Sequence, residues 1–82
     1  MHELKITEAV IEEIIAQAHS HDLKKIEKVV LSLGSEADFT EDEIKFCFET
    51  LVKGTSLEEV DLEFKEREGR EGLIIESIEG ER

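Results

Sequence analysis

Residues 40–54 read TEDEIKFCFETLVKG, and they decide how the rest of the chain is interpreted. The Thr-Glu-Asp-Glu start fits a capping box, in which Thr40 caps a helix and the side chain of Glu43 reaches back to it. Apolar residues then recur at helical spacing on one stripe: Ile44, Cys47, Phe48, Leu51 and Val52. Gly54 stands where a helix commonly ends. This stretch therefore predicts a capped amphipathic helix.

Before this helix, residues 26–33 are rich in Val, Ile and Leu and stop at Gly34, which predicts a strand. Its apolar side chains fall on both faces, as expected for a strand that is covered, at least in part, on each side.

Two elements are expected ahead of that strand. Residues 1–6 alternate loosely and precede Thr7, a residue favoured at helix N-caps, so we expect a short first strand there. From Glu8 to Ala18 apolar residues recur at helical spacing, with acidic residues early and histidines late, an order that complements the helix dipole. A first helix is therefore predicted to follow the short strand.

Two strands are expected after residue 54. Apolar and charged residues alternate over 60–65, and residues 73–78 form a second β-rich run. Between them, residues 66–72 are polar and contain Gly69 and Gly72. We expect the two runs to pair directly as an antiparallel hairpin, with one of the glycines at positive φ.

These elements follow one another in the order β-α-β-α-β-β, with no internal repeat. They predict a single α+β domain over residues 1–82, in which two helices pack on one face of a small mixed β-sheet of four strands. A chain of 82 residues leaves room for one compact core.

Composition limits the classes of partner and compartment. A net charge of −12 argues against nucleic acid and anionic membranes and suits a cation or a basic protein partner. The single cysteine, Cys47, excludes an intramolecular disulfide and a cysteine-rich zinc site. A signal peptide and a membrane span are not recognisable, so a cytoplasmic monomer or weak homodimer is expected.

Met1, His2 and Glu3 bring several metal donors together. They offer a free α-amine, the backbone nitrogen of His2, its imidazole and the Glu3 carboxylate. Amine and imidazole can close chelate rings through the intervening amide nitrogen, a donor set that suits Ni(II) or Cu(II). The alternative is that His2 is simply the second residue of a frayed end.

Joined to this start, three further stretches resemble the HypA/HybF family of nickel metallochaperones. They are Leu33-Gly34 at the end of a strand, Ile44–Thr55 as the second helix and its exit, and Leu73–Glu79 as the last strand. The resemblance runs in one order along essentially the whole chain. One feature departs from it: the family inserts a zinc-binding module with two Cys-x-x-Cys pairs between the last two strands, where this chain has only the loop 66–72. No structural zinc is therefore expected.

The resemblance implies that Ni(II) is bound transiently by the terminal amine of Met1, the backbone nitrogens of His2 and Glu3, and the His2 ring. It implies delivery to maturing nickel–iron hydrogenase, with urease as a second target. The implied partners are a HypB-like maturation GTPase and the hydrogenase large subunit. The alternative function is a protein-interaction domain that keeps the fold but not metal delivery.

Other candidate residues are weighed against plainer roles. Asp38 lies among the acids before the second helix, and we expect it to act as a weak or second-shell nickel ligand. The Glu3 side chain is either a contributor to the metal site or an exposed strand charge. His19 and His21 are interpreted as exposed residues near a helix end, and Cys47 as a buried, inert thiol. No phosphate loop and no nucleophile with a placed base is recognisable, so the chain is not expected to be an enzyme.

Overall fold

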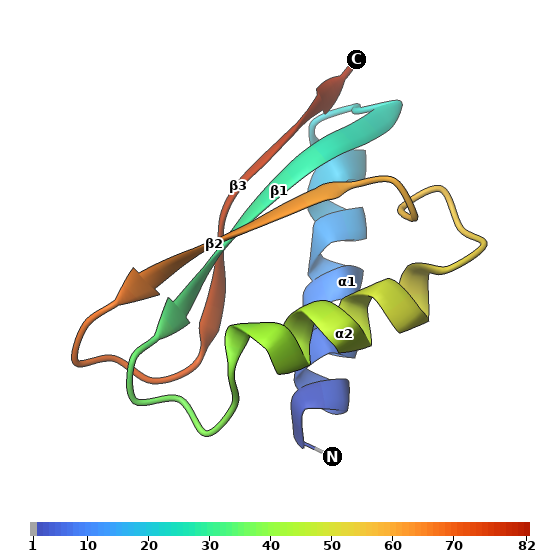
Figure 1. Cartoon of the computed structure of the whole chain (residues 1–82). Coiled ribbons are helices and arrows are strands. Elements are labelled where there is room, and N and C mark those ends of the chain that lie inside the picture. Colours follow the sequence, from blue (N-terminus) through green and yellow to red (C-terminus); the bar gives the residue numbers. More distant parts are fainter. Residues whose placement is uncertain (1) are drawn as a thin grey trace.

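The computed structural model describes the backbone of residues 2–82 and the side chains from residue 3 onward (Figure 1). It contains two helices and three strands. In chain order these are α1 (His2–Ser20), β1 (Lys25–Gly34), α2 (Glu41–Val52), β2 (Asp61–Arg67) and β3 (Leu73–Glu81).

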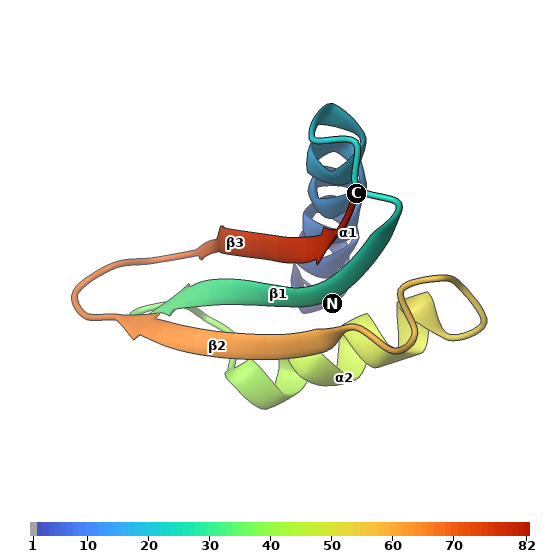
Figure 2. The ribbon, with the colours of Figure 1, turned by 90° about the horizontal axis from the view of Figure 1, so that it is seen from above.

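The three strands form one mixed sheet in the order β2-β1-β3. β1 is central, parallel to β2 and antiparallel to β3. Seen from above, α1 lies toward the β3 side of the sheet and α2 lies along β2 (Figure 2). The predicted fold class, two helices on a small mixed α+β sheet, is thus confirmed.

The core lies between both helices and one face of the sheet. Ile14 of α1, Ile44 of α2, and Val29 and Leu31 of β1 are fully buried. Half-buried side chains from the outer strands, including Phe64 and Ile75, pack against this cluster. Because each fully buried aliphatic side chain contributes about 1.5–3 kcal/mol, this layer supplies most of the stabilisation.

β1 is also shielded on its other face, where Val30 and Ser32 are buried outside the main core cluster. On that face the Lys28 ammonium forms an ion pair with the Glu63 carboxylate of β2. Its hydrogen bond to Glu63 and the attraction of that carboxylate raise the pKa of Lys28 above its ordinary value of 10.5. The burial of Val30 and Ser32 agrees with the partial cover expected on the second face of residues 26–33.

The expected strand over residues 1–6 is wrong: α1 begins at His2, and Met1 lies outside the described residues. Thr7, expected as the helix cap, lies within the helix, and its side chain is fully buried. Its hydroxyl donates a hydrogen bond to the carbonyl of Glu3, four residues earlier, at 2.6 Å. The physical reason is periodicity, because Ile6 continues the i, i+4 series of Val10 and Ile14 back by one turn. The sheet consequently has three strands instead of four.

The expected hairpin is also wrong, because β1 lies between β2 and β3. Val29 of β1 pairs with Leu62 on one side and with Ile78 on the other. The most apolar strand takes the central place, where both of its edges are paired. The two charged strands occupy the edges, as is usual for edge strands.

The connection between β2 and β3 passes around the end of β1 instead of turning back on itself. The amides of Gly34 and Glu36 donate to the carbonyls of Gly72 and Arg70, at 2.8 and 2.9 Å. A Cβ atom on Gly34 would collide with the Arg70 carbonyl, so only glycine fits there. Gly69 and Gly72 both have positive φ, as expected for this loop.

α2 begins as predicted. The Thr40 hydroxyl accepts the Glu43 amide at 3.2 Å, and the Glu43 carboxylate accepts the Thr40 amide at 2.8 Å. Ile44, Phe48 and Val52 are its buried residues. Within the described part of the chain, no helix is long and apolar enough to cross a membrane.

Candidate metal site

The predicted donors lie at the start of α1. The backbone of His2 is the first residue of the helix, whereas Met1 and the His2 side chain lie outside the described residues. The metal ligands predicted on these two residues therefore stay a prediction.

The backbone around them is informative. The first N–H groups of an α-helix lie ahead of its i to i−4 hydrogen-bond ladder, and α1 begins at His2. A metal that binds a deprotonated amide nitrogen can therefore do so here without breaking the hydrogen-bond ladder of α1. This donor chemistry fits a tetragonal cation.

Glu3 is half-buried in the first turn of α1, not an exposed strand residue as one of the two alternatives held. Its carbonyl accepts the Thr7 hydroxyl. This bond ties the first turn of the helix to a residue in the core, so the backbone next to the candidate donors is anchored.

Asp38 is exposed in the connection between β1 and α2. Among residues 3–82, whose side chains are described, no three His, Cys, Asp or Glu residues lie close enough together to hold a metal ion.

The two later histidines lie far from these donors. His19 is in the last turn of α1 and His21 follows it, both exposed. At about 1.5 Å per residue, the backbones of His2 and His19 are roughly 25 Å apart along α1, so they cannot share one ion. Cys47 is half-buried on α2, less covered than expected.

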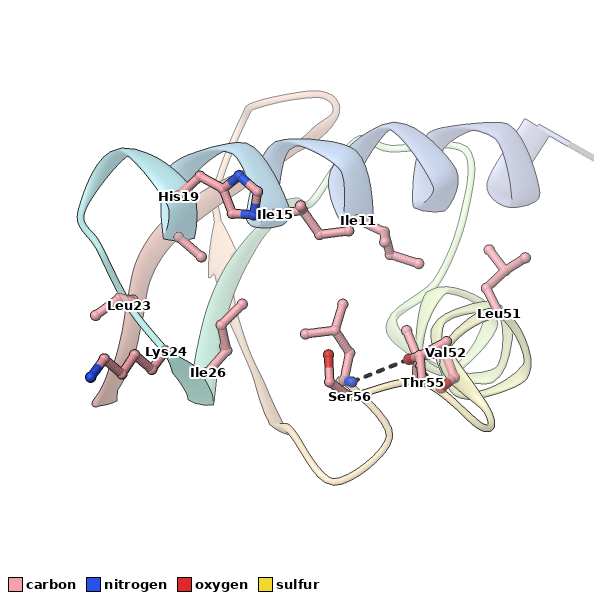
Figure 3. Close-up of a pocket in the computed structure, with 12 residues that line it drawn as sticks. Ile11, Ile15, His19, Leu23, Lys24, Ile26, Leu51, Val52, Thr55 and Ser56 are labelled. Carbon is pink, nitrogen blue, oxygen red and sulfur yellow. Dashed lines mark hydrogen bonds between the residues drawn. The ribbon is translucent and has the colours of Figure 1, made fainter. Parts of the chain in front are cut away.

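Sequence reasoning missed a groove alongside the second half of α1, which we call the lateral groove (Figure 3). It is a cavity of about 300 Å³ between α1, the start of β1 and the end of α2. Ile15, 43% exposed, is one of its lining residues. The only signal in the sequence was an isoleucine beside the buried stripe of the helix.

Comparison with known proteins adds a family. The family model described as "Hydrogenase/urease nickel incorporation, metallochaperone, hypA" matches residues 1–71. Hydrogenase maturation factor HypA of Dehalococcoides mccartyi strain 195 is 40% identical over 65 residues, which are 79% of this chain and 55% of that protein. Hydrogenase maturation factor HybF of Escherichia coli K12 is 36% identical over 62 residues, 76% of this chain and 55% of that protein. The chain thus spans about half the length of the curated relatives it matches.

A solved structure supports the fold. The solution structure of the Ni metallochaperone HypA from Helicobacter pylori superposes with a TM-score of 0.87. The match covers 96% of this chain and 97% of that one, at 13% sequence identity. At this identity, the likeness speaks for the fold alone.

Proposed function

Because the chain belongs to the hydrogenase/urease nickel-incorporation metallochaperone family, HypA, we propose that it binds Ni(II) transiently at its N-terminus and delivers it to a hydrogenase or urease during cytoplasmic maturation. The chain acts as a carrier of the metal and not as a catalyst. Nickel is its cargo.

The observation that carries this proposal is the start of α1 at His2. The amine of Met1, the amide nitrogens of His2 and Glu3 and the His2 imidazole are the proposed donors. Both amide nitrogens lie in the first turn of α1, ahead of the i to i−4 hydrogen-bond ladder of the helix. Amine and imidazole must lose their protons to bind, so nickel affinity falls as the solution becomes acidic.

Asp38 is the proposed weak or second-shell ligand. It is exposed, so its carboxylate is accessible to a cation held by the N-terminal donors. Asp38→Asn keeps the shape of the side chain and removes its charge. The expected result is a nickel affinity several-fold lower than that of the wild type, whereas an unchanged affinity removes Asp38 from the site.

The partners proposed for delivery are a maturation GTPase and the hydrogenase large subunit. We also propose that the loop 66–72 stands where the family carries its zinc module, and that the domain folds without zinc. A chelator should then leave the melting temperature unchanged, whereas a large drop would reveal a structural metal.

The test of metal binding is a nickel titration of protein with its native, untagged N-terminus, followed by calorimetry and absorption spectroscopy. His2→Ala should abolish specific binding and leave the circular dichroism spectrum and melting temperature unchanged. His19→Ala and His21→Ala are matched controls, because both histidines are exposed and lie at the far end of α1. Equal nickel affinity in wild type and His2→Ala would sink the proposal.

The second candidate function, an interaction domain without metal delivery, is favoured by one observation. The chain matches only about half of the length of its curated relatives. A hydrogenase-maturation assay with this chain as the only metallochaperone separates the two. Restored activity supports delivery, whereas nickel binding without restored activity favours the interaction domain.

A further inference from the structure

The lateral groove has walls from segments that are far apart in the sequence. Ile11 and Ile15 project from α1 into a space that Ile26 of β1 and Leu51 of α2 also border (Figure 3). The lining is mainly aliphatic, and it remains open to solvent at Ile15. An apolar side chain that entered the groove would therefore remove water from apolar surface on several sides.

The floor of the groove is preformed. After α2 the chain turns sharply, and the Thr55 hydroxyl both donates to the Val52 carbonyl at 2.6 Å and accepts the Leu57 amide at 3.1 Å. The Glu58 amide then donates to the Thr55 carbonyl at 3.2 Å. Leu57 is buried and anchors the turn in the core. Because the turn is already ordered, binding of a ligand does not incur the entropic cost of ordering it.

An acidic hollow adjoins the lateral groove. The two share Ile26 and the Thr55-Ser56 turn, and the hollow adds the exposed carboxylates of Glu27, Glu58 and Glu59. Among the described residues, Lys25 is the one basic residue that lines the hollow, and Lys24 lines the adjoining groove. A ligand that fills the groove and continues into the hollow therefore meets apolar surface first and negative charge second.

We propose that the lateral groove docks a short segment of a partner protein, which inserts an aliphatic side chain into the groove and sets a flanking Arg or Lys against Glu58 and Glu59. The proposal rests on the proposed function in one respect, since a carrier must dock on the protein that accepts its metal. A second copy of this chain is disfavoured as occupant, because it would bring another net charge of −12 to an acidic surface.

The position of the groove suits a handover. Ile15 lies 13 residues beyond His2 on the same helix, which at about 1.5 Å per residue is roughly 20 Å along α1. A partner held at the groove thus leaves the N-terminal end of α1 uncovered. Docking and metal transfer use opposite ends of one rigid helix.

The test uses the chain uniformly labelled with nitrogen-15 and three synthetic twelve-residue peptides. The basic peptide carries two leucines four residues apart, flanked by arginines. The acidic peptide replaces the arginines with glutamates, and the polar peptide replaces the leucines with serines. Titration should show that only the basic peptide binds, with amide shifts concentrated at Ile11, Ile15 and the 55–59 turn.

Variants assign the binding to the groove. Ile15→Glu should weaken the basic peptide at least tenfold, and Glu58→Lys with Glu59→Lys should weaken it several-fold and reduce its salt dependence. Phe46→Glu is the matched apolar control, because Phe46 is 70% exposed on α2 and does not line the groove. Glu76→Lys is the charge control, because Glu76 is exposed on β3 and lines neither the groove nor the acidic hollow. Both controls should bind like the wild type.

Three results would overturn the proposal. One is equal binding of the basic and acidic peptides, and another is no binding of any peptide at millimolar concentration. The third is sedimentation showing that the chain occupies the groove by self-association. Nickel titration of Ile15→Glu keeps the two proposals apart: its nickel affinity should equal that of the wild type. Failure of nickel binding in the wild type would sink the metal proposal and leave the peptide result standing.

Discussion

The two helices begin in opposite ways, and a threonine marks the difference. At α2, Thr40 stands before the helix and its hydroxyl accepts the amide of Glu43. At α1, Thr7 stands inside the helix and its hydroxyl donates to the carbonyl of Glu3. The start of α2 is therefore closed by side chains. In α1, which begins at His2, the threonine hydrogen bond lies inside the helix and joins its first two turns.

Beyond their first turns, both helices are anchored by a buried isoleucine in the same core. Replacing each isoleucine tests whether the two anchors are equally strong. Ile14 and Ile44 are both fully buried in one core cluster. Ile14→Ala and Ile44→Ala should each lower the free energy of unfolding by about 2–5 kcal/mol, because each leaves a cavity. Urea denaturation measures both. A cost for Ile14→Ala far below that of Ile44→Ala would show that α1 is only loosely docked.

Extending the chain ahead of α1 should affect metal binding and not stability. Adding Gly-Ser before Met1 converts the α-amine to an amide and removes a proposed ligand. We expect nickel affinity to fall by more than the roughly 10–100-fold that loss of an outer-shell partner costs. The same dipeptide appended after Arg82 is the control. Unchanged affinity in the N-terminal extension would exclude the amine as a donor.

Removing the cap of α2 should have the opposite effect: it should lower stability and leave metal binding largely unchanged. Thr40→Ala removes the cap and should cost about 1 kcal/mol of stability. Its effect on nickel affinity should be small, because Thr40 is not a proposed donor and the nearby Asp38 is unchanged. Thermal unfolding and nickel titration of one preparation give both values. A loss of nickel affinity here would place the α2 start in the metal site.

The smallest effect is expected at Thr7. Thr7→Val keeps the shape of the side chain and removes only its hydroxyl, and in helical geometry the Glu3 carbonyl keeps its main-chain bond. The cost should be about 0.5 kcal/mol or less, lower than for a typical hydrogen bond. Urea denaturation of Thr7→Val and Thr40→Ala compares the two losses of stability. A larger loss for Thr7→Val would contradict this ranking.

The two helix starts also differ in how well the sequence predicted them. The capping box and stripe of α2 are local signals, and both were correct. At the first helix, Thr7 carries the side chain of a cap, and only the burial of its hydroxyl in the core shows that it is not one. Local preference favoured a cap, and tertiary packing decided for a longer helix.

The strand pairing was beyond local reasoning for a related reason. The loop 66–72 has the composition of a hairpin turn, and its glycines do adopt positive φ. Nothing in the loop tells whether the next strand lies adjacent or one place further across. That depends on β1, some thirty residues earlier, which takes the middle because its residues are apolar on both faces.

The candidate metal donors were recognisable because they are contiguous in the sequence; Met1 and the His2 side chain lie outside the described residues. The lateral groove was not recognisable. Its walls come from α1, β1 and the end of α2, and each wall residue alone has the pattern of an ordinary core or surface position.

The central place of β1 also sets the order in which the molecule can be built. Residues 25–34 leave the ribosome before either of the strands that flank them, so an apolar strand is synthesised with both hydrogen-bonding edges open. α1 and α2 can cover one face early, but the edges wait until residues 61–81 have been made. Most of the sheet energy thus arrives late and through distant pairs, a pattern that slows folding. During synthesis, β1 therefore keeps both of its edges unpaired until its two neighbouring strands have been made.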